Sequence, residues 1–232
     1  MQSKTKRTFY TEAAYAVGII LLALGTAFME RADFGLSMIV APAYILHVKL
    51  SQYFSFFTFG MAEYVFQAFL ILIVVLIRRR FKLGYLFSFV TAVIYGFVLD
   101  GAISLVSLVP FGGTMPWRIV YFLSGMLMCS MGVSLFFHTY ISPEAYELLV
   151  KEVAEKYNFP ISKTKTAYDC SSLVLSIALS FAFFGFGHFE AINVGTFICA
   201  VANGFLIGRA SIVFEKFFEF KDALPMRNFF EK

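Results

Sequence analysis

The sequence has little charge and little cysteine. Charged residues fill 15% of the 232 positions, whereas about 25% is typical of a soluble domain. Together with a hydrophobic share of 59%, this deficit indicates an integral membrane protein in contact with the lipid bilayer. The three cysteines lie in separate apolar segments, which predicts neither a disulfide framework nor a metal site. The net charge of +4 is concentrated in short flanking segments, so we expect no nucleic-acid partner.

Catalytic motifs are missing as well. The stretch GFGHFE that begins at Gly185 lacks the third glycine of a dinucleotide-binding loop and does not follow a strand. The sequence contains no His-Glu-x-x-His zinc motif, no Walker loop and no Cys/His pair with metal spacing. The segments between the apolar runs are too short for a sizeable soluble domain. We therefore expect no enzymatic activity, no cofactor and no metal.

Long apolar runs are what the sequence has instead. A helix needs about 20 mostly apolar residues to cross the hydrocarbon core of a bilayer. The runs are continuous, which argues against the alternating pattern of a membrane β-barrel. They predict an all-α, polytopic membrane helix bundle that forms a single membrane domain over residues 1–232. The six expected transmembrane helices are Tyr10–Met29, Phe54–Ile77, Leu83–Val109, Pro116–Phe137, Ala167–Gly187 and Ala191–Val213.

Basic residues predict the orientation of these spans. With six spans, the basic N-terminus, second loop, fourth connection and tail all fall on one side, which the positive-inside rule assigns to the cytoplasm. We therefore expect both termini in the cytoplasm. The first connection is an exception, because it carries Arg31 and Lys49. The residues counted in the other segments include Lys4, Arg78–Lys82, Lys151, Lys156, Lys163, Lys165 and the tail, 221–232.

The two halves of the chain share one pattern of elements. Residues 10–110 and 116–220 each read as a span, a long connection and two further spans. At an offset near 106 residues, Gly25 aligns with Gly132 and Glu63 with Asp169, allowing slips of one residue. Three spans per copy is an odd number, so the second copy must enter the membrane from the opposite side. The pattern predicts two inverted three-helix repeats.

Each long connection has a signal for the start of a short helix. Ser142 and Pro143 supply a cap residue and a proline at the first helical position, and Glu144 supplies an acid in the first turn. Ser37 begins the matching segment of the first half, which is more apolar. Both helices could lie on the surface as amphipathic helices or re-enter the bilayer, and the apolar character of the first favours re-entrance.

Part of the sequence resembles a known family. The stretch ALGTAFMERADFGLS and the later NGFLIG are similar to the YczE/YitT-like family of small bacterial inner-membrane proteins, and the likeness extends from about Ala14 to Phe218. The family's Ala-Asp-Leu-Gly motif matches at Ala32–Gly35, but Met38 replaces an expected proline and HTYIS replaces the acidic motif in the second half. The resemblance implies a membrane fold in the bacterial cytoplasmic (inner) membrane and a transport role without a defined substrate.

Charged residues at the ends of apolar runs are candidates for a solute site. A charge at a helix centre costs about 2.5–3.5 kcal/mol, so such side chains usually face a bundle interior or a wet cavity. Glu63 and Asp169 start spans at equivalent positions, although each acid could instead lie at the interface near its own helix start. Broken helices near the short connections could bind anions or cations, and a loop ion pair between Arg31 and Asp33 is the alternative. The predicted substrate-binding residues are Arg31, Asp33, Ser37, Glu63, His138, Ser142, Glu144, Glu147, Asp169 and Asn203.

These expectations favour a secondary transporter of a small polar solute, with or without a coupled proton or cation. Its site would lie near the membrane midplane between the inverted repeats. Two alternatives stay open: an oligomeric channel or exporter, and a non-transporting regulatory or scaffold subunit. For Asn203, a hydrogen bond between helices is the alternative to a ligand role. A homodimer also stays open.

Overall fold

The apolar runs of the sequence form long helices in the computed structural model. The structure describes residues 6–35, 37–57, 59–110, 112–189, 192–227 and 230. The elements, in chain order, are β1 (Arg7–Tyr10), α1 (Thr11–Ala32), α2 (Ala41–Leu50), α3 (Phe59–Arg78), η1 (Leu83–Leu86), α4 (Phe87–Ser107), α5 (Met115–Phe137), α6 (Ala145–Tyr157), α7 (Ile161–Phe184), α8 (Val194–Phe217) and β2 (Phe218–Lys221).

Within the described residues, six of the helices are long and apolar enough to cross a membrane. This confirms the predicted class, a polytopic all-α membrane protein, and the predicted number of spans. The short helices α2 and α6 lie between the first two spans of each half, as expected. The six segments are Thr11–Ala32, Met61–Arg78, Leu83–Ser107, Met115–Phe137, Ile161–Phe184 and Val194–Phe217.

Helices α1 and α5 cross at the centre of the fold, and glycines make their close approach possible. A Cβ atom added to Gly25 would lie 2.7 Å from the carbonyl oxygen of Gly125, and one added to Gly132 would lie 2.8 Å from that of Gly18. Small residues let two backbones approach in this way. Because the lower residue numbers of α1 face the higher numbers of α5, the two helices run in opposite directions along this contact.

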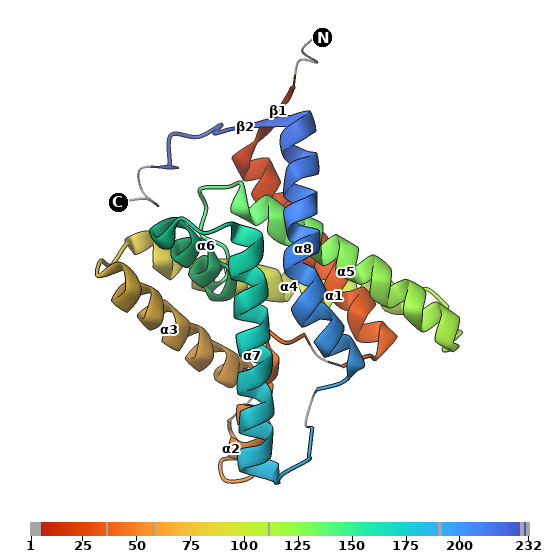
Figure 1. The fold of residues 1–232 in the computed structure, drawn as a ribbon. Coiled ribbons are helices and arrows are strands. Elements are labelled where there is room, and N and C mark those ends of the chain that lie inside the picture. The colour runs from red at the N-terminus through yellow and green to blue at the C-terminus, as the bar shows by residue number, and fades with distance from the viewer. Residues whose placement is uncertain are drawn as a thin grey trace.

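The other helix contacts recur in both halves. Helix α4 packs on α1 as α8 packs on α5, and α3 packs on α6 as α7 packs on α2. Helices α2 and α6 lie near opposite ends of α7 (Figure 1). The largest contact without a counterpart is that of α7 with α8, because α3 and α4 hardly touch within the described residues. The inverted relation between the halves stays a prediction.

The basic segments meet at one end of the molecule. Strands β1 and β2 pair in parallel, with Arg7 opposite Phe218, which brings both ends of the chain to one side (Figure 1). At the end of α3, Arg78 forms ion pairs with Glu152 and with Glu155 on α6, the latter at 2.8 Å. The assignment of this end to the cytoplasm stays a prediction.

Several helix boundaries differ from the expected ones. Helix α7 begins at Ile161, directly after Pro160, rather than at Ala167. Lys165 therefore lies inside a spanning helix, although its charge was expected in a loop. Helix α6 begins at Ala145, with Glu144 as its N-cap residue, so the expected start at Pro143 is two residues early.

The first half shows similar shifts. Helix α2 begins at Ala41 and not at Ser37, and α3 begins at Phe59 rather than at Phe54. In both cases, turns occupy part of the apolar sequence that precedes the helix. Hydropathy follows burial or lipid contact, so it does not distinguish an apolar turn from an apolar helix.

Candidate functional site

Buried charges gather where α6 packs on α7. The side chains of Lys165 and Asp169 are fully buried, and Glu147 is 3% exposed. The Nζ atom of Lys165 lies 3.0 Å from Oδ1 of Asp169 and 3.3 Å from Oε1 of Glu147. Lys165 and Asp169 share one face of α7 because they are four residues apart. One ammonium group therefore serves two carboxylates from two helices.

A third carboxylate joins this group from α3. The hydroxyl of Tyr146 donates a hydrogen bond of 2.5 Å to Oε2 of Glu63. Tyr146 lies in the first turn of α6, directly before Glu147. The bond thus connects the beginning of α3 to the beginning of α6.

The fourth carboxylate, Glu144, has no such partner. Its side chain is buried, and among the described residues its Oε1 atom has no hydrogen-bond partner. Burial raises the pKa of Glu144 well above its usual range, the charges of Glu147 and Glu63 raise it further, and Lys165 lowers it. Under these conditions the protonated form of the carboxyl group is favoured.

We call Glu63, Glu144, Glu147 and Asp169, together with Lys165, the acidic cluster. It contains four carboxyl groups and one ammonium group. Unpaired buried charge is so costly that such groups take up protons or bind a counter-ion instead. The acidic cluster can therefore hold protons or a cation, which is the chemistry that a coupled transport site requires.

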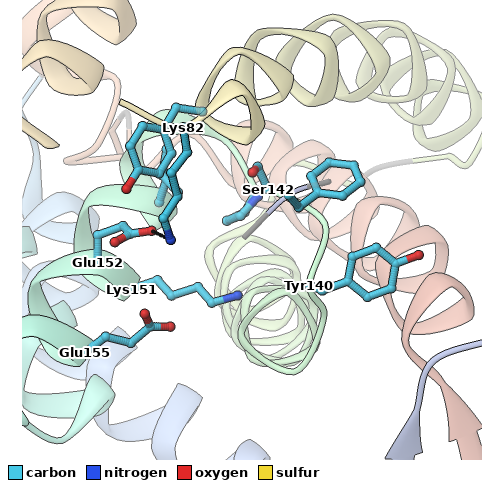
Figure 2. A pocket seen from close by; sticks show the side chains of 10 residues that line it. Lys82, Tyr140, Ser142, Lys151, Glu152 and Glu155 are labelled. Atoms are coloured by element: carbon cyan, nitrogen blue, oxygen red, sulfur yellow. Dashed lines mark ion pairs between the residues drawn. The ribbon is translucent and has the colours of Figure 1, made fainter. Parts of the chain in front are cut away.

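A pocket of about 370 Å³ lies beside the start of α6 (Figure 2). Ser142 and Pro143 line it, and the next residue is Glu144. Leu148 also lines it and directly follows Glu147. The segment 142–148 therefore contributes residues both to the pocket and to the acidic cluster.

The pocket carries charges of both signs. Figure 2 shows the side chain of Lys151 extending across it toward Tyr140. The ammonium of Lys151 donates a hydrogen bond of 2.8 Å to the carbonyl of Thr139. On the other side, Lys82 lies 3.7 Å from Glu152, which also pairs with Arg78. These ion pairs hold α6 against the end of α3.

The structure brings four of the predicted site residues together, namely the four acids of the cluster. Ser142 lies beside them: its carbonyl accepts a hydrogen bond of 2.7 Å from Thr91, and its side chain lines the pocket. Ser37 lies apart, with its hydroxyl 3.7 Å from the sulfur of the next residue, Met38.

The remaining predicted residues lie elsewhere. Arg31 donates hydrogen bonds to the carbonyls of Val106 and Val109 at the end of α4, the second at 2.6 Å. The side chain of Asp33 is 87% exposed and lies 3.1 Å from Arg118. The ion pair that forms here thus joins Asp33 to Arg118 rather than to Arg31.

His138 and Asn203 also lie outside the cluster. His138 ends α5, where its Nε2 atom is 3.0 Å from Glu215 and its ring stacks on Phe220. Asn203 lies in α8, and its Oδ1 atom is buried without a hydrogen-bond partner among the described residues. Neither residue contributes to the arrangement around Lys165.

Comparison with known proteins places the chain in a family. A model described as a family of unknown function (DUF6198) matches residues 9–211. The chain belongs to this family. No curated protein and no solved structure matches the chain. The matched DUF6198 region contains the whole acidic cluster, and the likeness to YczE/YitT-like proteins stays a prediction.

Two residues of this arrangement are not among those that the sequence predicts. Lys165 was counted as a loop lysine, although its spacing of four residues from Asp169 is the signal that could have revealed the pair. Tyr146 was not considered, because its bond to Glu63 joins residues that are far apart in the sequence. Only the folded chain brings these two groups together.

Proposed function

We propose that this protein is a secondary transporter of a small polar solute, with the acidic cluster as its binding and coupling site. The observation that carries the proposal is the gathering of four carboxyl groups where α6 packs on the spanning helices α3 and α7, with two of them sharing the buried ammonium of Lys165. Ionisable residues inside membrane bundles are costly and typically belong to ion, proton or substrate pathways. A pocket lined by Ser142, Pro143 and Leu148 adjoins the segment that carries Glu144 and Glu147.

The packing of α1 on α5 supports a moving pair of repeats. One shift in residue number takes Gly18 to Gly125 and Gly25 to Gly132. The same shift therefore converts the contact between Gly18 and Gly132 into the contact between Gly125 and Gly25. A two-fold axis through this crossing accounts for that exchange and for the recurrent helix contacts. In inverted repeats, one half rocks against the other and opens the site to alternate sides.

Proton flux in proteoliposomes tests the proposal. The full chain is reconstituted with a trapped pH-sensitive dye, and gradients of guanidinium, glycine, glucose or sulfate are imposed. We expect at least one of these solutes to move protons. Glu63→Gln should lower the rate about tenfold or more, because it removes an ionisable group of the cluster. Glu219→Gln, which changes an exposed acid on β2, should leave the rate unchanged.

Three results oppose the proposal. Equal proton flux in wild type and Glu63→Gln would exclude the cluster as the coupling site. Solute flux without any proton movement would instead support the channel alternative. Absence of flux for all four solutes would favour a non-transporting subunit.

A further inference from the structure

One side of the acidic cluster contains a basic side chain, and the side that faces α3 does not. Glu147 and Asp169 share the ammonium of Lys165. On the side of α3, the partner of Glu63 is the neutral hydroxyl of Tyr146. Within the described part of the chain, neither Glu63 nor Glu144 lies within ion-pair distance of a basic side chain. This side of the cluster is where a second positive charge fits.

The unpartnered atoms of this region are hydrogen-bond acceptors. They include Oε1 of Glu144, whose side chain is 7% exposed, and Oδ2 of the fully buried Asp169. A neutral side chain adds an independent acceptor: Gln67 is 4% exposed and its Oε1 has no partner among the described residues. Gln67 follows Glu63 by one helical turn, so both face the same way. Only a ligand that donates hydrogen bonds satisfies these oxygens.

The geometry favours an organic cation over a metal ion. In the described residues, no three His, Cys, Asp or Glu side chains are grouped so that they could hold a metal. The cluster already holds one ammonium, that of Lys165, between two carboxylates. Ammonium and guanidinium groups combine a positive charge with several N–H donors, which matches what the acceptors lack.

We propose that the acidic cluster binds a small organic cation with N–H donors, an ammonium or guanidinium compound, in exchange for protons. This proposal rests on the proposed transport function and specifies its substrate class. The cation approaches from the pocket, whose wall of Ser142 and Pro143 leads directly to Glu144. It then displaces the proton that neutralises Glu144.

Exchange for protons makes binding depend on pH. Where one proton leaves for each cation, apparent affinity rises about tenfold per pH unit. Lys165 keeps its charge in this exchange, because Glu147 and Asp169 stabilise it. Titratable groups outside the acidic cluster also face it, one from each of five helices. They are Tyr15 of α1, Tyr95 of α4, Cys129 of α5, Tyr146 of α6 and Tyr168 of α7.

Equilibrium binding to the purified full chain in nanodiscs tests this inference without transport. Calorimetry is performed with guanidinium, with tetramethylammonium, which has the same charge but no N–H group, and with sulfate. A pH indicator in weak buffer reports released protons. We expect saturable guanidinium binding with proton release, at least tenfold weaker tetramethylammonium binding and no sulfate binding. Glu144→Gln and Gln67→Leu should each weaken guanidinium binding, and the exposed control Glu219→Gln should not.

The outcomes separate the two proposals. Equal binding of guanidinium and tetramethylammonium, binding without proton release, or no guanidinium binding by folded wild-type protein overturns the cation proposal. Proton-coupled flux of glycine, glucose or sulfate without guanidinium binding preserves the transporter but overturns its cation class. Guanidinium binding without flux of any solute preserves the site and overturns the transport function.

Discussion

Lys165 shows how the partners of a residue determine where it can lie. Lysine is almost never fully buried unless it is paired, and this one is fully buried in a spanning helix. Two carboxylates within 3.3 Å make that position tolerable. From sequence alone, a lysine near the start of an apolar run reads as a loop charge. Its burial could not be predicted without the position of Glu147, which lies on another helix.

Removing this ammonium should destabilise the fold. Lys165→Met leaves Glu147 and Asp169 buried without a cation, and breaking a buried pair typically costs about 3–5 kcal/mol. We expect a lower midpoint in thermal unfolding of the detergent-solubilised protein. Lys163→Met, two residues away and exposed, is the matched control. Replacing Asp169 by Asn in the Lys165→Met variant should restore part of the lost unfolding midpoint. If Lys165→Met does not lower the midpoint and the second change does not raise it, the ion pairs do not stabilise the fold.

The pKa of Glu144 makes stability depend on pH. The folded chain raises this pKa well above the usual 4.5, mainly through burial. The folded state therefore keeps a proton that the unfolded state has already lost, and stability falls as pH rises from 4.5 toward the raised pKa. Unfolding midpoints measured across this range should decline less in Glu144→Gln than in wild type. An identical decline in both proteins would contradict the assignment.

At the scale of elements, the hydropathy of the sequence predicted the six spans because lipid contact is a property of composition. It did not predict where helices begin, since apolar turns before α2 and α3 have the same composition as helices. The start of α7 was missed for a related reason. Charged and polar residues from Ile161 to Thr166 look like a loop, although the helix begins directly after Pro160 and α6 packs against it.

The glycine crossing of α1 and α5 can be tested directly. Gly25→Ala places a Cβ 2.7 Å from backbone atoms of α5, a contact that neither helix can relieve by rotating a side chain. Overpacking of this kind typically costs about 1–3 kcal/mol, so we expect a lower unfolding midpoint. Gly96→Ala on α4, where nothing lies within 4 Å, is the control. It should be neutral or raise stability by about 0.5–1 kcal/mol, as alanine suits a helix interior better than glycine. Equal effects of the two changes would refute a close crossing.

At the scale of the whole molecule, one stretch of chain joins the acidic cluster to the pocket. Residues 142–148 supply lining residues of the pocket and also carry Glu144 and Glu147 of the cluster. Ion pairs with Arg78 hold α6 to the end of α3, while Tyr146 and Glu147 bind it to the other members of the cluster. Sequence equivalence pointed to Glu63 and Asp169, but only the fold shows that α6 packs on both of the helices that carry these acids.

The measurement that tests the central claim most directly is solute-driven proton flux with Asp169→Asn in proteoliposomes. The amide keeps the size of the side chain and removes the negative charge that Asp169 presents to Lys165 inside the acidic cluster. The account predicts that guanidinium gradients of either direction move protons in wild type and in the control Glu219→Gln. It also predicts that Asp169→Asn reduces this proton flux at least tenfold when equal amounts of folded protein are compared. Undiminished proton flux in Asp169→Asn would contradict the claim that the acidic cluster couples transport to protons.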